Sequence, residues 1–381
     1  MHNGGVAYGD KMVFYMIEDT IETSKSNKRV ALVFGGRGVE HQISCLSACR
    51  IMRFIKSSFK SPLCIYISRD GGWYFFPSGG MLIASADSVD ISSLTPTFPA
   101  LVKGKSGFLH DGGLIEVDCC IPALHGDFGE DGIVQGALEC AKIPYVGQGV
   151  LQGALCADKE YTKLVAISEK IPTAPYAVYR KSVYEKSEAE KALAEAKSSF
   201  GYPMFIKPAG LGSSFGDCGV RTDEEFHEAL KNALEICHGK VLIEKLISAE
   251  LELECAFLDG ENKIVTEPSS VSVAGGCYDF KRKYIDKSAK TKVTAEIDEN
   301  LKALAKEYSK KLVDRLSLLD LARIDFFLAD GKLYFNEINT FPGFTEDSLY
   351  EKMLKEVGID GEALIRRLVS LAEARRNDRY I

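Results

Sequence analysis

The sequence has 381 residues, of which 46% are hydrophobic, and it carries a formal net charge of -7 with a pI near 5.6. Its length exceeds that of one ordinary hydrophobic core and predicts two or three globular domains. The acidic balance and the lack of a long Lys/Arg-rich block argue against a nucleic acid or a membrane surface as partner. No apolar run reaches the roughly 18 residues that a membrane-spanning helix needs.

The cysteines and the N-terminal segment indicate a compartment. Eleven cysteines, an odd number without a C-x-x-C pair, lie in apolar contexts, which is typical of small buried residues in a reducing cytoplasm. Neither a disulfide framework nor a zinc site is expected. Residues 1–28 hold one short apolar run, too short for a signal-peptide core, and we expect them to form a mobile leader.

An α/β domain follows this leader. Arg29 to Phe34 is a continuous apolar run that predicts a buried strand, a glycine-rich loop follows at 35–38, and helical spacing extends from Glu40 to Ile55. Val117 to Leu124 predicts another buried strand, which ends in HGDFGEDG (125–132). Polar residues at the carboxyl end of a parallel strand lie where open α/β sheets bind ligands. We therefore expect part of a site there, although the glycines could also mark a plain turn.

The middle of the chain predicts a phosphate-binding surface. One helix over 153–169 carries Lys159 and Lys163, and Lys207 ends a strand just before LGSSFG (211–216). Glycines let the backbone approach a phosphate while amides and hydroxyls donate hydrogen bonds, and a lysine beside such a loop is a recurring phosphate clamp. The alternative is a hairpin tip without a ligand.

Two later segments differ in what they indicate. Glu250, Glu252 and Glu254 alternate along a strand, and such alternation ordinarily means one solvated face. Segment 274–290 has no periodicity and combines glycines, tyrosines and basic residues. This composition predicts a lid whose cations close over phosphates, and a plain surface loop is the alternative.

Three polar residues, Asp325, Glu337 and Asn339, lie among core residues of a predicted hairpin over 321–343. A buried carboxylate without a partner is costly, and a bound cation removes that penalty. Carboxylate and amide oxygens are hard ligands suited to Mg²⁺, which completes its shell with water and phosphates. The alternative is a buried hairpin with two strained carboxylates near a salt-bridging Arg323.

The register of this hairpin decides whether one metal can bind. A two-residue turn at Asp330-Gly331 with a regular ladder would point Asp325 and Glu337 to opposite faces. A three-residue loop with Gly331 in the left-handed conformation would bring both carboxylates, Asn339 and Arg323 to one face. We therefore predict the three-residue loop.

The combined motifs resemble the D-alanine:D-alanine ligase family over roughly residues 29–375. In family order, the matching segments are GGRGVE (35–40), HGDFGEDG (125–132), DK (158–159), FIKP with LGSSFG (205–216), VLIEK (241–245), YDFKRKY (278–284), ARIDFF (322–327) and NEINTFPGFT (336–345). The combination is specific, because HGxxGEDG separates these ligases from other ATP-grasp enzymes.

The resemblance implies an ATP-grasp fold of mixed α/β and α+β class, in which ATP lies between two antiparallel sheets. After the leader, a Rossmann-like (pre-ATP-grasp) α/β domain over 29–152 would bind the first D-alanine. A central α+β subdomain over 153–243 and a C-terminal α+β domain over 244–381 would clamp ATP, and the C-terminal domain would hold the lid, the metal site and the acceptor subsite.

The resemblance also implies residue roles. For ATP, these are Lys159, Lys207 and the lid residue Lys283 at the phosphates, Glu244, Lys245 and Ile247 around the adenine, and Glu252 at the ribose. Asp325, Glu337 and Asn339 would bind two Mg²⁺ ions, for which Mn²⁺ can substitute. Glu40 would hold the ammonium of the first D-alanine and connect through Ser213 to Tyr284 on the lid. His125 would lie near the first subsite, Ser348 and Leu349 would bind the second substrate, and Arg323 with the Gly343 amide would stabilise the oxyanion.

The implied reaction joins two D-alanines through an acyl phosphate, in a cytoplasmic enzyme of cell-wall synthesis that commonly forms homodimers. Tyr284, preceded by Lys283, resembles members that use an amine acceptor, so a depsipeptide product is not expected. Asp347 and Cys277 depart from common family residues, which leaves D-serine open as the acceptor. A catalytically silent nucleotide-binding regulator is the alternative from another functional class.

Overall fold

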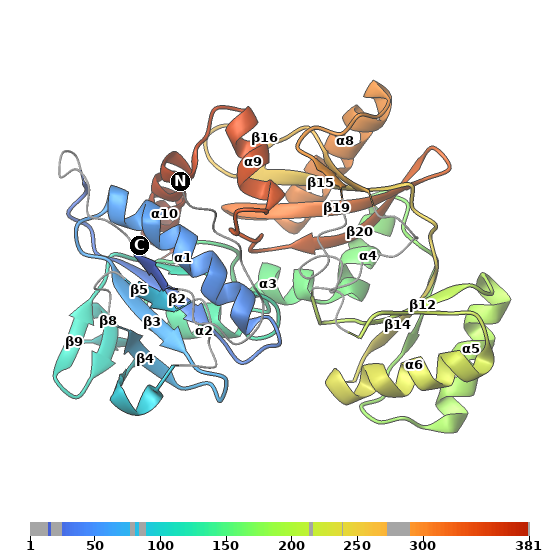
Figure 1. The fold of residues 1–381 in the computed structure, drawn as a ribbon, viewed down its shortest axis with the longest axis horizontal. Coiled ribbons are helices and arrows are strands. Elements are labelled where there is room, and N and C mark those ends of the chain that lie inside the picture. The colour runs from blue at the N-terminus through green and yellow to red at the C-terminus, as the bar shows by residue number, and fades with distance from the viewer. Residues whose placement is uncertain are drawn as a thin grey trace.

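The computed structural model describes residues 14–16, 25–76, 81–83, 89–212, 216–237, 239–272 and 290–379, with backbone alone at 14–16, 81–83 and 376–379. Figure 1 shows an N-terminal part in blue and cyan, a central part in yellow-green, and an orange and red C-terminal sheet, with helices α3 and α4 between them. No helix in the described segments is long and apolar enough to cross a bilayer. Of ten described cysteines, all free thiols, eight are buried, which confirms the predicted packing role.

The N-terminal part is built on a five-stranded sheet. In sheet order its strands are β10 (Cys119–Pro122), β2 (Val30–Gly35), β3 (Leu63–Ile67), β4 (Trp73–Phe76) and β6 (Thr95–Pro96). β10, β2 and β3 are parallel, and every residue of β2 is buried, as expected for a parallel strand covered on both faces. The remaining elements are α1 (His41–Ser58), η2 (Ile91–Ser93), β7 (Phe98–Val102), β8 (Lys105–His110), β9 (Gly113–Glu116), α2 (Ile133–Cys140), and the paired β1 (Phe14–Met16) and β5 (Met81–Ile83).

The central part is a four-stranded antiparallel sheet with two helices packed on it. Its strands are β11 (Tyr176–Tyr179), β14 (Val241–Lys245), β12 (Met204–Pro208) and β13 (Cys218–Val220), and its helices are α5 (Lys186–Ser199) and α6 (Asp223–Ile236). Alanines and larger apolar residues from the helices and the sheet form one core. β14 ends at Lys245, two residues beyond the predicted domain boundary at 243.

The single helix predicted over 153–169 is wrong. The structure has two helices there, α3 (Val150–Ala157) and α4 (Lys159–Ser168). Asp158 separates them in an extended conformation, and its side chain accepts a hydrogen bond from the Glu160 N–H as the N-cap of α4. An aspartate cap that satisfies a backbone donor of α4 explains the break.

The C-terminal part is a six-stranded antiparallel sheet. Its strands are β18 (Lys290–Lys292), β17 (Ser269–Ser272), β15 (Leu251–Leu258), β19 (Leu321–Ala329) and β20 (Lys332–Asn339), with β16 (Ile264–Val265) paired to β15. Helix α8 (Glu299–Leu316) packs on one face. The last helices, α9 (Leu349–Glu356) and α10 (Gly361–Arg379), share a core with α1 and β2, so the end of the chain returns to the N-terminal part. The mixed α/β and α+β class is confirmed.

The predicted three-residue loop of the β19–β20 hairpin is wrong. Ala329 pairs with Lys332, so the turn has two residues, Asp330 and Gly331, and both have positive φ, as in a type I′ turn. A bulge restores the even register farther along: Phe326 pairs with Phe335, but Asp325 pairs with Glu337. The extra residue, Asn336, therefore brings Asp325 and Glu337 to one face of the hairpin, which is the effect expected from the longer loop.

Candidate active site

The central and C-terminal sheets face each other across a layer of charged side chains. Lys207 on β12 lies with its Nζ 3.0 Å from Asn336 Oδ1 on β20 and 5.6 Å from the ring centroid of Phe327 on β19. The face of β19 that bears Phe327 also bears Asp325, because strand residues alternate. The two sheets thus meet at the face where the sequence predicts phosphate and metal binding.

Three buried charged groups form a row on the central side of this layer. Glu244 on β14 lies 2.9 Å from Lys163 Nζ through one oxygen and 3.0 Å from Lys207 Nζ through the other. Burial by itself would raise the pKa of Glu244, but the two ammonium groups outweigh it and hold that pKa at about 2. Burial lowers the pKa of Lys163, whereas Glu244 overcomes burial and raises the pKa of Lys207.

The second predicted phosphate lysine also reaches the hairpin. Lys159 is the first residue of α4, and its Nζ lies 3.4 Å from Glu337 Oε2 and donates to the carbonyl of Leu211. Lys159 and Lys207 therefore approach adjacent residues of β20 from two different elements. Such paired cations fit an anion with several phosphate groups.

Asp325, Glu337 and Asn339 come together on the hairpin as the sequence predicts. Arg323 binds Asp325 through two hydrogen bonds of 2.8 and 2.6 Å, and Asn339 Nδ2 donates to Asp325 Oδ2 at 2.9 Å. Asp325 and Glu254 overcome the effect of burial and raise the pKa of Arg323. The guanidinium thus stays charged beside the carboxylates.

The same oxygen set fits Mg²⁺ in its chemistry. Two carboxylates and an amide oxygen on one face are hard donors, and the neighbouring lysines would bring phosphate oxygens to complete the shell. Within the described residues, no group of three or more His, Cys, Asp or Glu side chains could hold a metal by itself. The amide and the nucleotide would therefore be needed as ligands.

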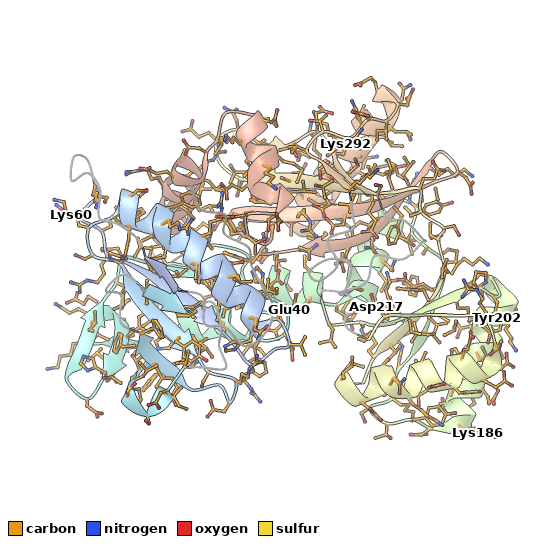
Figure 2. All side chains as sticks on the ribbon, in the orientation of Figure 1. Glu40, Lys60, Lys186, Tyr202, Asp217 and Lys292 are labelled. Atoms are coloured by element: carbon orange, nitrogen blue, oxygen red, sulfur yellow. The ribbon has the colours of Figure 1, made fainter. Side chains whose placement is uncertain are left out.

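Glu40 is the N-cap residue of α1, and two glycines from other parts of the chain lie against its carboxylate. Figure 2 shows it at the end of α1 nearest the centre of the molecule, and only 7% of its surface is exposed. A Cβ on Gly126 would come 1.9 Å from Glu40 Oε2, and one on Gly212 would come 2.9 Å from the same oxygen. Glycine at both positions lets the backbone at Gly126 and at Gly212 approach this carboxylate.

His125 is bonded inside the protein through both ring nitrogens. Its Nδ1 lies 3.1 Å from the carbonyl of Phe341 and its Nε2 lies 2.9 Å from Ser47 Oγ, which also accepts the N–H of Phe344. Burial lowers its pKa to about 4, so the ring is neutral near pH 7. Because a carbonyl only accepts, Nδ1 carries the proton and Nε2 accepts from Ser47.

Glu130, in the same loop, is a site residue that the sequence did not single out. Its carboxylate accepts hydrogen bonds from the N–H of Gly126 (2.8 Å), the N–H of Phe341 (2.7 Å) and the hydroxyl of Thr340 (3.1 Å). Burial and the nearby Glu40 raise its pKa to about 7. Together with His125, it ties the loop 125–132 to the turn that follows β20.

The predicted acceptor residues lie directly after that turn. The N–H of Thr345 donates to Ser348 Oγ at 3.0 Å, and a Cβ on Gly343 would lie 3.0 Å from the same oxygen. Ser348 precedes the first residue of α9, Leu349, which is buried. This packing brings the Gly343 backbone close to Ser348.

Of the remaining predicted residues, some have described positions and contacts, and the others lie outside the described residues. Glu252 pairs with Phe327 and therefore lies on the same face of the sheet as Asp325. We expected the alternating glutamates to form a solvated face, but this face lies against the central sheet. Lys245 Nζ donates to the carbonyls of Phe200 and Tyr202, and Ile247 follows β14. Ser213, Lys283, Tyr284 and most of the predicted lid lie outside the described residues.

Comparisons with known proteins agree over nearly the whole chain. The family model described as "D-ala D-ala ligase N-terminus" matches residues 29–148, and that described as "D-ala D-ala ligase C-terminus" matches residues 165–370. The D-alanine–D-alanine ligase of Acetivibrio thermocellus is 36% identical over 369 residues, covering 92% of this chain and 97% of the relative. That of Caldicellulosiruptor bescii is 36% identical over 351 residues, covering 90% and 94%.

Two solved structures show the same arrangement. The D-alanine-D-alanine ligase from Coxiella burnetii superposes with a TM-score of 0.78 at 27% identity and covers 92% of this chain and 95% of its own. The VanG D-Ala:D-Ser ligase from Enterococcus faecalis also has a TM-score of 0.78, at 31% identity, with 91% and 100% covered. The family models alone match more than half of the chain. The chain therefore belongs to the D-alanine–D-alanine ligase family.

Proposed function

We propose that the protein uses ATP to join two D-alanine molecules into D-alanyl-D-alanine for peptidoglycan synthesis, as a cytoplasmic homodimer without a nucleic-acid or membrane partner. The supporting observation is the convergence of Lys159 and Lys207 on the hairpin face that carries Asp325 and Glu337. Cations for phosphates and oxygens for a metal meet there, within a family of ligases.

The first step transfers the γ-phosphoryl group of ATP. A carboxylate oxygen of the first D-alanine forms a bond to the γ-phosphorus, the bond from that phosphorus to the β-γ bridging oxygen breaks, and ADP leaves with the electron pair. Lys159, Lys207 and the lid residue Lys283 stabilise the phosphate oxygens, while Glu40 holds the substrate ammonium. Asp325, Glu337 and Asn339 would hold two Mg²⁺ ions, or Mn²⁺, which neutralise phosphate charge when bound.

The second step forms the peptide bond. The amine of the second D-alanine attacks the acyl carbon, the carbon–oxygen bond to phosphate breaks, and the proton lost by the amine leaves on the released phosphate. Arg323 and the Gly343 N–H stabilise the oxyanion of the tetrahedral intermediate. Ser348 and Leu349 bind the second substrate. His125 and Glu130 hold the turn that follows β20 through their hydrogen bonds to Thr340 and Phe341. Ser213 and Tyr284 connect Glu40 to the lid, which excludes water from the acyl phosphate.

The remaining residues bind the nucleoside. Glu244, Lys245 and Ile247 surround the adenine edge, and Glu252 binds the ribose. Because both oxygens of Glu244 already bind lysines, its contribution to adenine recognition comes through the strand backbone that it orders.

The test is ADP release from purified protein with ATP, Mg²⁺ and D-alanine, followed by mass identification of the product. We expect D-alanyl-D-alanine, with no release above background by an Asp325→Ala variant. Equal release by that variant, or none by the wild type, would overturn the proposal. Parallel reactions with D-serine or D-lactate added identify the acceptor substrate. If D-alanyl-D-serine is the main product, the acceptor is D-serine and not D-alanine.

A further inference from the structure

The β20 bulge turns two consecutive polar residues toward the nucleotide side of the sheet. Phe335 and Ile338, which flank the pair, both lie in the same hydrophobic core. In a regular strand, residues three apart point to opposite faces, so the extra residue must lie between them. Asn336 and Glu337 are then both directed away from that core, and each contacts one lysine, Lys207 and Lys159 respectively.

Asn336 completes the surroundings of the Lys207 ammonium. A lysine ammonium has three N–H donors and no acceptor, so the Asn336 amide must present its oxygen at the observed 3.0 Å. The Glu244 carboxylate accepts a second donor at 3.0 Å. Among the described residues, Asn336 and Glu244 are the two oxygen partners of Lys207 Nζ, and the third N–H donor remains for a ligand.

We propose that Asn336 is a positioning residue for ATP: its neutral amide holds the Lys207 ammonium in place while leaving the positive charge of Lys207 to the phosphates. This inference rests on the proposed function. Neutrality matters because the Glu244 carboxylate is already shared by Lys163 and Lys207. A second carboxylate on Lys207 would cancel the remaining positive charge of this group, two ammoniums against one carboxylate, and weaken its attraction for a phosphate chain.

An Asn336→Asp variant separates this role from a structural one. A structural tie would be strengthened, because a carboxylate binds an ammonium more strongly than an amide does. A positioning role for phosphates predicts the opposite effect on nucleotide binding. ADP affinity should fall by about tenfold or more, while adenosine affinity stays within about twofold and the melting temperature does not fall.

Affinities are measured by titration calorimetry of the full chain in Mg²⁺-free buffer, so that metal binding by the new carboxylate does not contribute. Asn262→Asp is the matched control: it adds the same charge at an exposed site, and its ADP affinity should stay unchanged. Unchanged ADP affinity in Asn336→Asp, or an equal loss of adenosine affinity, would overturn the inference. Absence of D-alanine-dependent ADP release by the wild type would instead overturn the proposed function. The two proposals therefore fail in different experiments.

A second set of variants tests whether Asn336 acts through Lys207. Asn336→Leu should weaken ADP binding by about fivefold or more, whereas adding it to Lys207→Met should change the affinity by less than about twofold. Additive losses would show that Asn336 acts independently of Lys207 and would refute the proposed route. Asn336→Ala serves in the same cycle if the leucine variant does not fold.

Discussion

Asp325 and Glu337 lie opposite each other on β19 and β20, although a two-residue turn joins these strands. With a regular ladder, that turn would place Asn336 opposite Asp325 and point Glu337 to the other face. The bulge absorbs Asn336 as the extra residue, so the carboxylates share one face. The oxygen set is thus created by a register change inside the strand.

Deletion of Asn336 should leave the two carboxylates paired. The deletion removes the extra residue, so a regular ladder from Phe326 and Phe335 still places Glu337 opposite Asp325. We expect Mn²⁺ binding at saturating ADP, measured by electron paramagnetic resonance, to stay within about threefold of the wild type. Glu337→Gln is the comparison, since it keeps the register and removes a ligand. A deletion variant that binds Mn²⁺ as poorly as Glu337→Gln would show that the bulge itself shapes the site.

Replacement of Lys163 by methionine should destabilise the protein strongly. Lys163 is fully buried beside Glu244, and removal of one partner from a buried ion pair typically costs about 3–5 kcal/mol. Urea unfolding measures the loss. Lys186→Met, at an exposed position on α5, is the control and should change stability by less than about 0.5 kcal/mol. A loss below about 1 kcal/mol in Lys163→Met would mean that Lys207 alone compensates the Glu244 charge.

His125 should make the fold sensitive to mild acid. Burial lowers its pKa from 6.5 to about 4, so the unfolded chain binds a proton between these values and the folded chain does not. Its contribution is therefore present above pH 6.5 and is lost as the pH falls toward 4. The full linkage corresponds to about 3 kcal/mol.

The test of this linkage compares unfolding free energies at pH 7 and pH 4.5. His125→Gln should lower stability at pH 7 and should show a smaller drop on acidification than the wild type, because the proton-binding group is gone. His227→Gln, on α6, is the control and should keep the wild-type drop. An unchanged drop in His125→Gln would place the acid sensitivity at another group.

Arg50 and Glu351 connect the helix that follows Glu40 to the helix that follows Ser348. Arg50 on α1 binds Glu351 on α9 through two hydrogen bonds of 2.7 and 2.8 Å. The pair is partly exposed, so its removal should cost only about 1 kcal/mol of stability. We expect Glu351→Ala to raise the KM for D-alanine at the acceptor site more than the KM for ATP.

Exchange of the two charges supplies the control for this prediction. Arg50→Glu alone should act like Glu351→Ala, and the double variant Arg50→Glu with Glu351→Arg should recover most of the lost D-alanine affinity in steady-state kinetics. A double variant no better than the single ones would show that the two side chains act separately.

Much of the candidate site could be recognised from the sequence because its groups are locally anomalous. Asp325 in an apolar strand, Lys207 before a glycine-rich loop, and the polar run after Leu124 are all costly or unusual without a ligand. Patterns of this kind depend only on neighbours in the chain, so they can be recognised without knowledge of the fold. The break at Asp158 was also readable in principle, since aspartate is a preferred helix N-cap.

Only the tertiary structure decided how these groups meet. The bulge at Asn336 follows from Phe335 and Ile338 sharing one core, and no local pattern of strand residues states which core each side chain enters. Glu130 binds the N–H of Phe341 across 211 positions of the chain, and Glu244 binds lysines from a helix and another strand. The residue types were set by sequence, whereas packing between distant elements determined the register and partners that make them one site.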